Sequence, residues 1–522
     1  MNPLRQGGAP LVAAGIFLSR LAGLVRQRVL SHYLGLSLPA DAFNQAFRIP
    51  NFLQNLFGEG VLSASFIPAY ARLRAEGRDE EARRLAGAVL GVLSIAVAVL
   101  VALGITAAPW LVTVLAPGFH GATRELTIDL VRILFPGVGF LVFSAWCLSI
   151  LNSHRKFFLS YAAPVLWNFA IILATIAAPS AGPLETVVVW VAWGAVAGGL
   201  LQLLIQLPAV VALLQGLRPS LGRENAGLRT VLGNFFPAFV TRGVTQISAF
   251  VDGILASLLP QGAVTAMANA QTLYTLPVSL FGMSIAAAEL PELSAAVVHG
   301  DGGHAALRAR LEDGRRRVAF FVVPTVIAFL LLGDVVAALF FQTGRFTADD
   351  ARYVWMILAG SATGLLATTQ GRLYNSVYFA LHDTRAPLRF ATIRVSLSIM
   401  LGYLAAVPLP RLLELNPRWG AVGITAAAGV SGWVEFVLLK RGLAARIGPE
   451  APRGSYPLRL WGAAVSAGLV GWLALILVGQ RLGPVLRAVA VLVPFGLAYL
   501  LLAAAGGIPL ARRMIGGTGP RP

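Results

Sequence analysis

Residues 85–116 read LAGAVLGVLSIAVAVLVALGITAAPWLVTVLA, a run without a charged side chain. A helix of roughly 20 predominantly apolar residues crosses the hydrocarbon core of a bilayer, so this run predicts a transmembrane helix. The whole 522-residue chain is similar in character: 57% of its residues are hydrophobic and 12% are charged. Soluble domains are about 45–50% apolar and about 25% charged. With a mean hydropathy of +0.75, the chain is expected to be a polytopic, all-α integral membrane protein.

Runs of this kind recur along the chain. Their lengths and spacing predict about 14 transmembrane helices. These runs lie at 11–34, 41–70, 85–116, 125–152, 161–179, 186–214, 231–257, 264–298, 318–341, 351–379, 390–407, 420–439, 460–479 and 485–508.

Basic side chains are distributed unevenly among the loops between these runs. One alternating set of loops and termini carries 26 Lys and Arg residues, whereas the opposite set carries five. Positively charged loops stay in the cytoplasm, so the bias predicts that both termini are cytoplasmic. The formal net charge of +18 is explained by the same loops, and no nucleic-acid partner is expected.

Several functional classes are excluded by what the sequence lacks. The single Cys147 cannot form a disulfide framework or a thiolate metal site, and the six histidines show no metal-ligand spacing. Neither Lys156 nor Lys440 follows a glycine, so a Walker A loop is absent. No hydrolase motif occurs, and no loop is long enough for a soluble catalytic domain. We therefore expect a secondary transporter, not an enzyme, with no cofactor and no metal.

A polar stripe interrupts the second run. Its members follow one another at spacings of three or four residues, which keeps them on one helix face. They are Asp41, Asn44, Arg48, Asn51, Asn55 and Glu59. Lipid cannot satisfy such a face, which must contact protein or water. A hydrogen-bonded seam between helices is one interpretation. We favour the wall of a hydrated cavity, because the stripe carries charges of both signs.

Polar residues of the first run favour an anionic substrate. Ser19, Arg20 and Arg26 surround Gly23, and the two arginines can face one cavity if the helix bends there. An arginine that faces lipid costs about 2.5–3.5 kcal/mol, so a hydrated cavity is the better location. The guanidinium fork binds phosphate oxygens in a bidentate manner. The pattern therefore predicts a phosphate-bearing substrate.

One further acid lies within a membrane run. Asp252, with Arg242 on the same run, is a candidate for coupling transport to a monovalent cation or to the membrane potential. A purely structural ion pair is an equally good interpretation of the two residues.

Two internal similarities predict a repeat. LFGEGVLSASFIPAYA (56–71) is similar to LFGMSIAAAELPELSA (280–295), and LNSHRKFFLSYAAP (151–164) to LHDTRAPLRFA (381–391). Six helices separate the members of each pair, so the copies share one orientation. We expect two pseudo-symmetric six-helix lobes around a central cavity, at 1–220 and 221–445. Two further helices and a tail follow at 446–522.

Two long stretches near the N-terminus begin a series of recognisable motifs: SRLAGLVRQRVLSHYLG (19–35) and ADAFNQAFRIPNFLQNLFGEGVLSASFIPAYARL (40–73). Further stretches follow in order: VLAPGF (114–119), ILNSHRKF (150–157), GGLLQLLIQLP (198–208), FQTGRFTADD (341–350) and YFALHDTRAPLR (378–389). In these stretches the chain resembles the MurJ/MviN family of the MOP superfamily.

This resemblance implies a lipid II flippase of the bacterial inner membrane. Such a protein moves undecaprenyl-diphosphate-linked peptidoglycan precursor from the cytoplasmic to the outer leaflet by alternating access. A groove for the lipid tail in the last two helices, and cell-wall synthases as partners, are implied as well. By position, Ser19, Arg20 and Arg26 match family residues of the cavity that face the diphosphate and sugars. Asp41 matches an acid that the family requires, and Glu59 matches the glutamate of the family's FxEG segment.

The chain departs from the family pattern at several polar positions. Gln27 stands where the family has an Asp, and Gln54 and Asn55 stand where it has paired arginines. Gln271 and Thr272 replace an Asp-Arg pair, and Gly402 replaces an Asn of the family's sodium site. Arg48 and Arg242 could compensate in part. A flippase for another polyprenyl-diphosphate-linked oligosaccharide therefore remains the alternative, ahead of a glycan polymerase and of a non-transporting scaffold.

Overall fold

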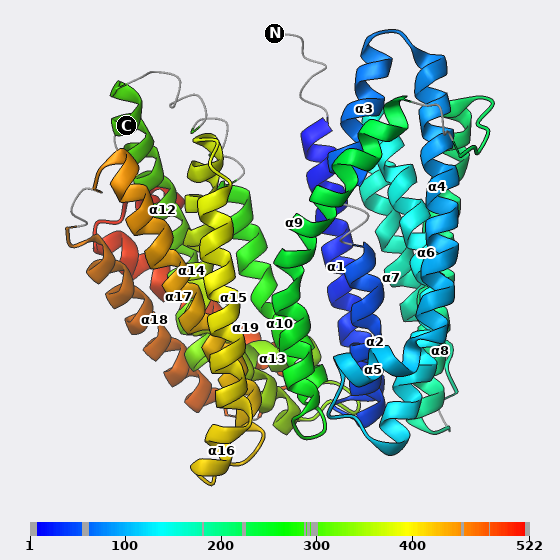
Figure 1. Cartoon of the computed structure of the whole chain (residues 1–522). Coiled ribbons are helices and arrows are strands. Elements are labelled where there is room, and N and C mark those ends of the chain that lie inside the picture. Colours follow the sequence, from blue (N-terminus) through cyan, green and yellow to red (C-terminus); the bar gives the residue numbers. More distant parts are fainter. Residues whose placement is uncertain are drawn as a thin grey trace. The chain divides into compact units, whose positions relative to one another are not determined.

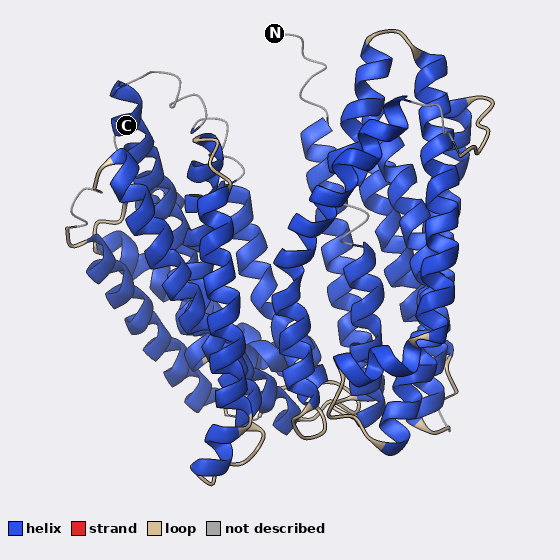
Figure 2. Ribbon diagram, viewed as in Figure 1, coloured by secondary structure: helices blue, strands red, loops and turns tan. Residues whose placement is uncertain are grey.

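The computed structural model describes residues 8–54, 62–179, 182–221, 226–286, 289, 293, 301–449, 454–479 and 481–516. These residues form helices joined by short connections, and Figure 2 shows no strand among them. The predicted all-α fold is confirmed.

The chain divides into two compact units, Met1–Val264 and Thr265–Pro522. The first contains α1 (Gly8–Leu34), α2 (Leu38–Gln54), α3 (Ser63–Ala75), α4 (Asp79–Thr106), α5 (Ala108–Leu115), α6 (Gly121–Ser153), α7 (Phe157–Ala177), α8 (Leu184–Leu214) and α9 (Ala226–Ser257) (Figure 1). Helix α9 packs on α2, α3, α4 and α5, all within this unit. The boundary between lobes at 220/221 was inferred from the internal sequence repeat, and it stays a prediction.

The second unit begins within α10 (Ala263–Pro277). It continues with the π-helical segment η3 (Val278–Met283), α12 (Asp301–Leu331), α13 (Gly333–Phe341), α14 (Ala348–Ala380), α15 (Arg385–Ala406), α16 (Pro408–Leu412), α17 (Trp419–Ile447), α18 (Tyr456–Val478), α19 (Pro484–Ala505) and α20 (Pro509–Met514). Helix α17 packs along both α14 and α15, and α18 packs along α19.

Eight helical segments of the described residues are long and apolar enough to cross a membrane. They are α4, α6, α7 and α8 in the first unit, and α15 with α16, α17, α18 and α19 in the second. The pair α12 and α13, bent by 85°, makes a ninth if it is one span. A multi-pass membrane protein is thereby confirmed, whereas the number of 14 spans stays a prediction.

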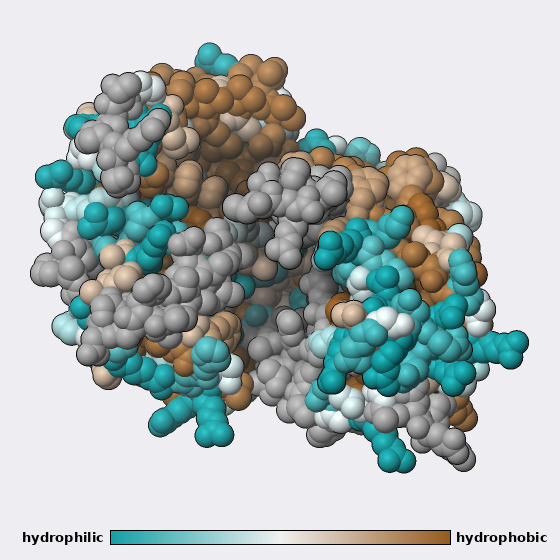
Figure 3. Space-filling view, turned by 90° about the horizontal axis from the view of Figure 1, so that it is seen from above, coloured by the Kyte–Doolittle hydropathy of each residue, from teal (hydrophilic) through white to brown (hydrophobic). Residues whose placement is uncertain are grey.

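Polar side chains collect at the helix ends and apolar ones along the helix flanks. In the view of Figure 3, each unit shows hydrophilic residues on the end that faces the reader and hydrophobic residues around its sides. Large apolar side chains are exposed along the last two long helices, including Leu469 and Trp472 on α18 and Val493 and Leu497 on α19. Such faces suit contact with lipid.

Small residues bring helices of the first unit close together. A Cβ added at Gly198 on α8 would lie 2.8 Å from Cδ1 of Trp167 on α7. The indole Nε1 of Trp167 donates a 2.9 Å hydrogen bond to the carbonyl of Ala195. Likewise, a Cβ at Gly15 on α1 would lie 2.7 Å from Cβ of Tyr161 on α7. Close approach through small residues is typical of membrane helices. It fixes α1 against α7 and α7 against α8, and so places the arginines of α1.

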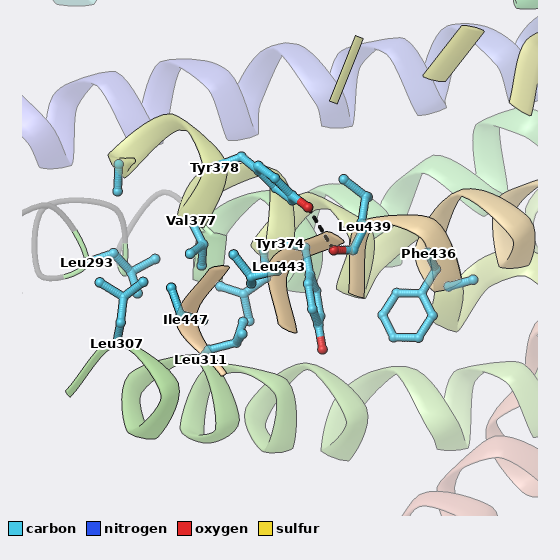
Figure 4. Close-up of a cluster of buried hydrophobic side chains, with 13 residues drawn as sticks. Leu293, Leu307, Leu311, Tyr374, Val377, Tyr378, Phe436, Leu439, Leu443 and Ile447 are labelled. Atoms are coloured by element: carbon cyan, nitrogen blue, oxygen red, sulfur yellow. Dashed lines mark hydrogen bonds between the residues drawn. The ribbon is translucent and has the colours of Figure 1, made fainter. Parts of the chain in front are cut away.

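A cluster of buried apolar side chains joins α12, α14 and α17 in the second unit (Figure 4). It includes Leu307, Leu311, Tyr374, Val377, Tyr378, Phe436, Leu439, Leu443 and Ile447. The Tyr378 hydroxyl donates a 3.0 Å hydrogen bond to the carbonyl of Leu439, which satisfies the one polar atom that this ring brings into the cluster.

The turns α6–α7 and α14–α15 have the same backbone structure. Arg155 and His382 both adopt left-handed backbone angles, with φ of 59° and 57°. In each turn the next residue donates an N–H bond five residues back: Lys156 to Leu151 at 2.8 Å, and Asp383 to Tyr378 at 2.9 Å. This geometry is a Schellman-type helix end. It supports the repeat inferred from the sequences of these two turns.

Candidate functional site

Arg26 on α1 is held by aromatic rings from two other helices. Its Cζ lies 5.3 Å from the ring centroid of Phe47 on α2 and 5.8 Å from that of Trp167 on α7. The two rings stack on each other, with centroids 5.3 Å apart. Because ring faces attract cations, the guanidinium has a defined position without needing a carboxylate.

The charge of Arg26 is not neutralised within the described part of the chain. Its Nε is buried and has no hydrogen-bond partner there, and no ion pair joins the residue to a described acid. A guanidinium carries planar donors that match the oxygens of phosphate. Arg26 is therefore suited to bind an anionic group that a ligand brings with it.

Ser19 and Arg20 precede Arg26 on the same helix. Arg20 is exposed and Ser19 is half-buried. Between Arg20 and Arg26, Gly23 faces α7, where an added Cβ would lie 3.9 Å from Oδ1 of Asn168. This amide oxygen is buried and has no hydrogen-bond partner among the described residues. The surroundings of Arg26 thus offer an accepting oxygen in addition to a cation, as a polar ligand requires.

Asp41 is buried and makes a contact within the protein. Its side chain is 2% exposed, and its Oδ2 accepts a 2.6 Å hydrogen bond from the backbone N–H of Gly262. Gly262 has a φ of +88°, and a Cβ there would lie 2.9 Å from Cβ of Leu36. In this conformation the Asp41 carboxylate therefore fixes the loop after α9 against the start of α2.

Arg48 lies across α9. Its guanidinium lies in the space that a Cβ at Gly253 would occupy, so a side chain there would force the guanidinium to shift, and Asp252 lies within electrostatic range of it. The rings of Phe52 and Phe250 meet edge to face beside this contact, with centroids 4.8 Å apart. Asp252 was predicted to interact with Arg242, whose side chain lies outside the described residues. Among the described residues, Arg48 lies within electrostatic range of Asp252.

The remaining members of the polar stripe are distributed differently. Asn44 donates a 2.9 Å hydrogen bond to the carbonyl of Ala40 in its own helix, and Asn51 is half-buried. Asn55 and Glu59 lie outside the described residues. Two charged members, Asp41 and Arg48, thus contact α9 or the loop that follows it. Substrate contacts of the stripe stay predictions.

Sequence reasoning missed a charged pair in the second unit. Nε of Arg394 on α15 lies 2.8 Å from Oε2 of Glu435 on α17. The exposed Arg372 on α14 lies within electrostatic range of both. The missed signal was Glu435 itself, a lone acid in the apolar run 420–439, because an ionisable residue within a membrane span suggests a functional site.

No metal site is found in the part of the chain that the structure describes. It holds no group of three or more His, Cys, Asp or Glu side chains that could bind a metal ion. Cys147 is buried and makes no disulfide.

The sequence model of one protein family, described as "Lipid II flippase MurJ", matches residues 30–493. The chain belongs to the MurJ family. This confirms the resemblance seen in the sequence. The match begins after Arg20 and Arg26, so the family assignment does not depend on these two arginines.

Two MurJ relatives are similar over most of their length. The lipid II flippase MurJ of Burkholderia cenocepacia is 32% identical over 474 residues, which cover 89% of this chain and 89% of the relative. The probable lipid II flippase MurJ of Rhizobium meliloti is 32% identical over 429 residues, covering 81% and 77%.

Solved structures agree with the MurJ assignment at the level of fold. A lipid II flippase MurJ in an inward closed conformation matches with a TM-score of 0.78 at 22% identity, covering 97% of this chain and 99% of that one. An inward-facing MATE family multidrug resistance transporter of the MOP superfamily matches with a TM-score of 0.66 at 20% identity, covering 82% and 95%. The fold is that of MOP superfamily transporters.

Proposed function

We propose that this protein is a lipid II flippase, which moves undecaprenyl-diphosphate-linked peptidoglycan precursor from the cytoplasmic to the outer leaflet. The observation that carries the proposal is Arg26, a cation held by Phe47 and Trp167 with no acidic partner in the described chain. Such a group is suited to the diphosphate of a lipid-linked substrate. Membership of the MurJ family supports the same substrate.

Transport proceeds by alternating access of the two units. The protein resides in the bacterial inner membrane with both termini in the cytoplasm, as the 26-to-5 loop bias indicates. Exposed apolar faces of α18 and α19 suit contact with the polyprenyl tail, and cell-wall synthases use the flipped product. The charge of Asp252 couples the cycle to a monovalent cation or to the membrane potential.

Complementation tests this proposal. The intact protein is expressed in MurJ-depleted cells, and lipid II in the outer leaflet is measured directly. We expect the wild type to restore growth and exposure, and Arg26→Ala to abolish both while the protein still accumulates. Arg132→Ala is the control, because Arg132 is exposed and pairs with Asp129, three residues away on the same helix. Full growth with Arg26→Ala would contradict the proposal.

A second candidate is a flippase for another polyprenyl-diphosphate-linked oligosaccharide. It is favoured by α10, where Gln271 donates a 3.2 Å hydrogen bond to Thr275 and Thr272 bonds to the carbonyl of Ala268. The charged pair of the family is thus replaced here by amide and hydroxyl groups that bond within their own helix. Failure of a folded, inserted wild type to complement MurJ depletion would favour this candidate.

A further inference from the structure

The ion pair of Arg394 and Glu435 lies inside membrane-spanning helices. Arg394 is nine residues after the start of α15, and Glu435 is 12 residues before the end of α17. At about 1.5 Å per residue, each lies roughly 14–18 Å along its helix from the α14–α15 end of this unit. Their side chains are 30% and 18% exposed. The pair is therefore partly accessible, at a depth where lipid would leave it unsolvated.

A second arginine adds to this pair, and no second acid joins them among the described residues. Arg372 is eight residues before the end of α14, about 12 Å along the helix, and its side chain is exposed. It interacts electrostatically with Arg394, Glu435 and Tyr274. The hydroxyl of Tyr274 on α10 is hydrogen-bonded to Thr368, one turn before Arg372 on α14. The cluster of Arg372, Arg394 and Glu435 thus carries a net charge of +1.

The excess charge identifies which way the cluster faces. An ion pair that only joins two helices needs one arginine, and a second arginine that faced lipid would be energetically costly. Other exposed positions of the same helices are apolar, among them Ile393 and Met400 on α15 and Val437 on α17. The cluster must therefore face a hydrated space, where an anion can approach it.

We propose that Arg372 and Arg394 form an anion-binding site of the second unit that takes the diphosphate of the polyprenyl-linked substrate. Glu435 is a positioning residue: it holds the Nε edge of Arg394 and leaves the Nη donors for phosphate oxygens. The site supplies the positive charge that Gln271 and Thr272 do not bring from α10. This inference takes from the proposed function only the class of substrate, a polyprenyl diphosphate. It does not depend on which glycan the diphosphate carries.

Binding of undecaprenyl diphosphate to the purified full chain in lipid nanodiscs tests the proposal, with undecaprenol as the probe that lacks phosphate. We expect Arg372→Gln and Arg394→Gln each to weaken binding of the diphosphate about tenfold or more and to leave undecaprenol unaffected. Arg352→Gln is the matched control on α14, because Arg352 pairs with Asp349 at an exposed position. Unchanged binding by Arg372→Gln would overturn the proposal.

A charge swap separates substrate binding from a structural role. Arg394→Glu alone places two acids together and is expected to lower thermal stability. Combining it with Glu435→Arg restores an ion pair, so stability should recover, whereas diphosphate binding should stay weak because the cation has moved to α17. Wild-type binding by the swapped protein would overturn the proposal. Should the swapped protein not fold, Arg372→Gln decides, since it leaves the pair intact. Diphosphate binding without lipid II transport would contradict only the proposed function.

Discussion

The guanidinium of Arg48 on α2 lies against the backbone of Gly253 on α9, in a space that a Cβ at residue 253 would fill. Asp252 lies beside it. A glycine here, next to the acid, lets one helix receive the charged side chain of another. The contact joins two segments about 200 residues apart in the sequence, and it explains why Arg48 can be accommodated within a membrane helix.

Gly253→Ala is expected to lower the thermal stability of the protein and its accumulation in the membrane, because the methyl group displaces Arg48 from Asp252. Gly233→Ala is the control on the same helix. No atom lies within 4 Å of a Cβ at Gly233, and alanine favours the helix by about 1 kcal/mol. The double variant Gly253→Ala with Arg48→Ala should recover stability relative to Gly253→Ala alone. Equal stability of the two glycine variants would show that the contact is unimportant.

Substitutions of Asp41 test whether this position needs a charged carboxylate or only an oxygen that accepts a hydrogen bond. Asp41→Asn keeps an oxygen that can accept the bond from Gly262, whereas Asp41→Ala leaves that N–H unpaired, at a cost of about 1–3 kcal/mol. If the residue is structural in this way, Asn should support more transport and a higher unfolding temperature than Ala. Equal loss of transport in two equally stable variants would instead assign the charge to the transport cycle.

Asp383, in the turn between α14 and α15, predicts a dependence of stability on pH. Hydrogen bonds from the backbone N–H of Ala386, and then from Arg446, hold the pKa of this carboxyl below its ordinary value. A carboxyl with a lowered folded-state pKa stabilises the fold above its unfolded pKa of about 3.9. That stabilisation is lost as the pH falls through the folded-state pKa.

The measurement is the unfolding temperature of wild type and Asp383→Asn from pH 7 down to pH 3. We expect the variant to be less stable at pH 7, and the two curves to converge below about pH 4. A constant difference at every pH would show that the ionised form contributes nothing.

The sequence predicts the membrane fold well because its signal is local. An apolar run such as 85–116 crosses a bilayer whatever surrounds it, and α4 and α5 occupy that run in the structure. The turns at Arg155 and His382 were recognised as similar from sequence, and their matching backbone angles and hydrogen bonds agree.

Pairing between helices is far less predictable, because it depends on contacts between residues distant in sequence. Arg242 was the candidate neighbour of Asp252 because the two residues share one run, and that contact stays a prediction. The proximity of Arg48, which comes from α2, was not foreseen. Glu435 passed unnoticed because its partner, Arg394, is 41 residues away on another helix. Helical periodicity placed Asp41 and Arg48 on one face. It could not tell that this face packs on α9 and the following loop.

The aromatic support of Arg26 yields a prediction about substrate affinity. Phe47→Leu removes one of the two rings beside the guanidinium while keeping an apolar side chain. A cation–π contact contributes about 0.5–2 kcal/mol, so binding of lipid II should weaken by about 2- to 30-fold. Phe169→Leu on α7 is the control, because Phe169 is 53% exposed and the rings described beside Arg26 are those of Phe47 and Trp167. Titration of both variants with lipid II in nanodiscs measures the effect. Equal affinities would mean that Arg26 keeps its position without Phe47, and that Trp167 alone supports it.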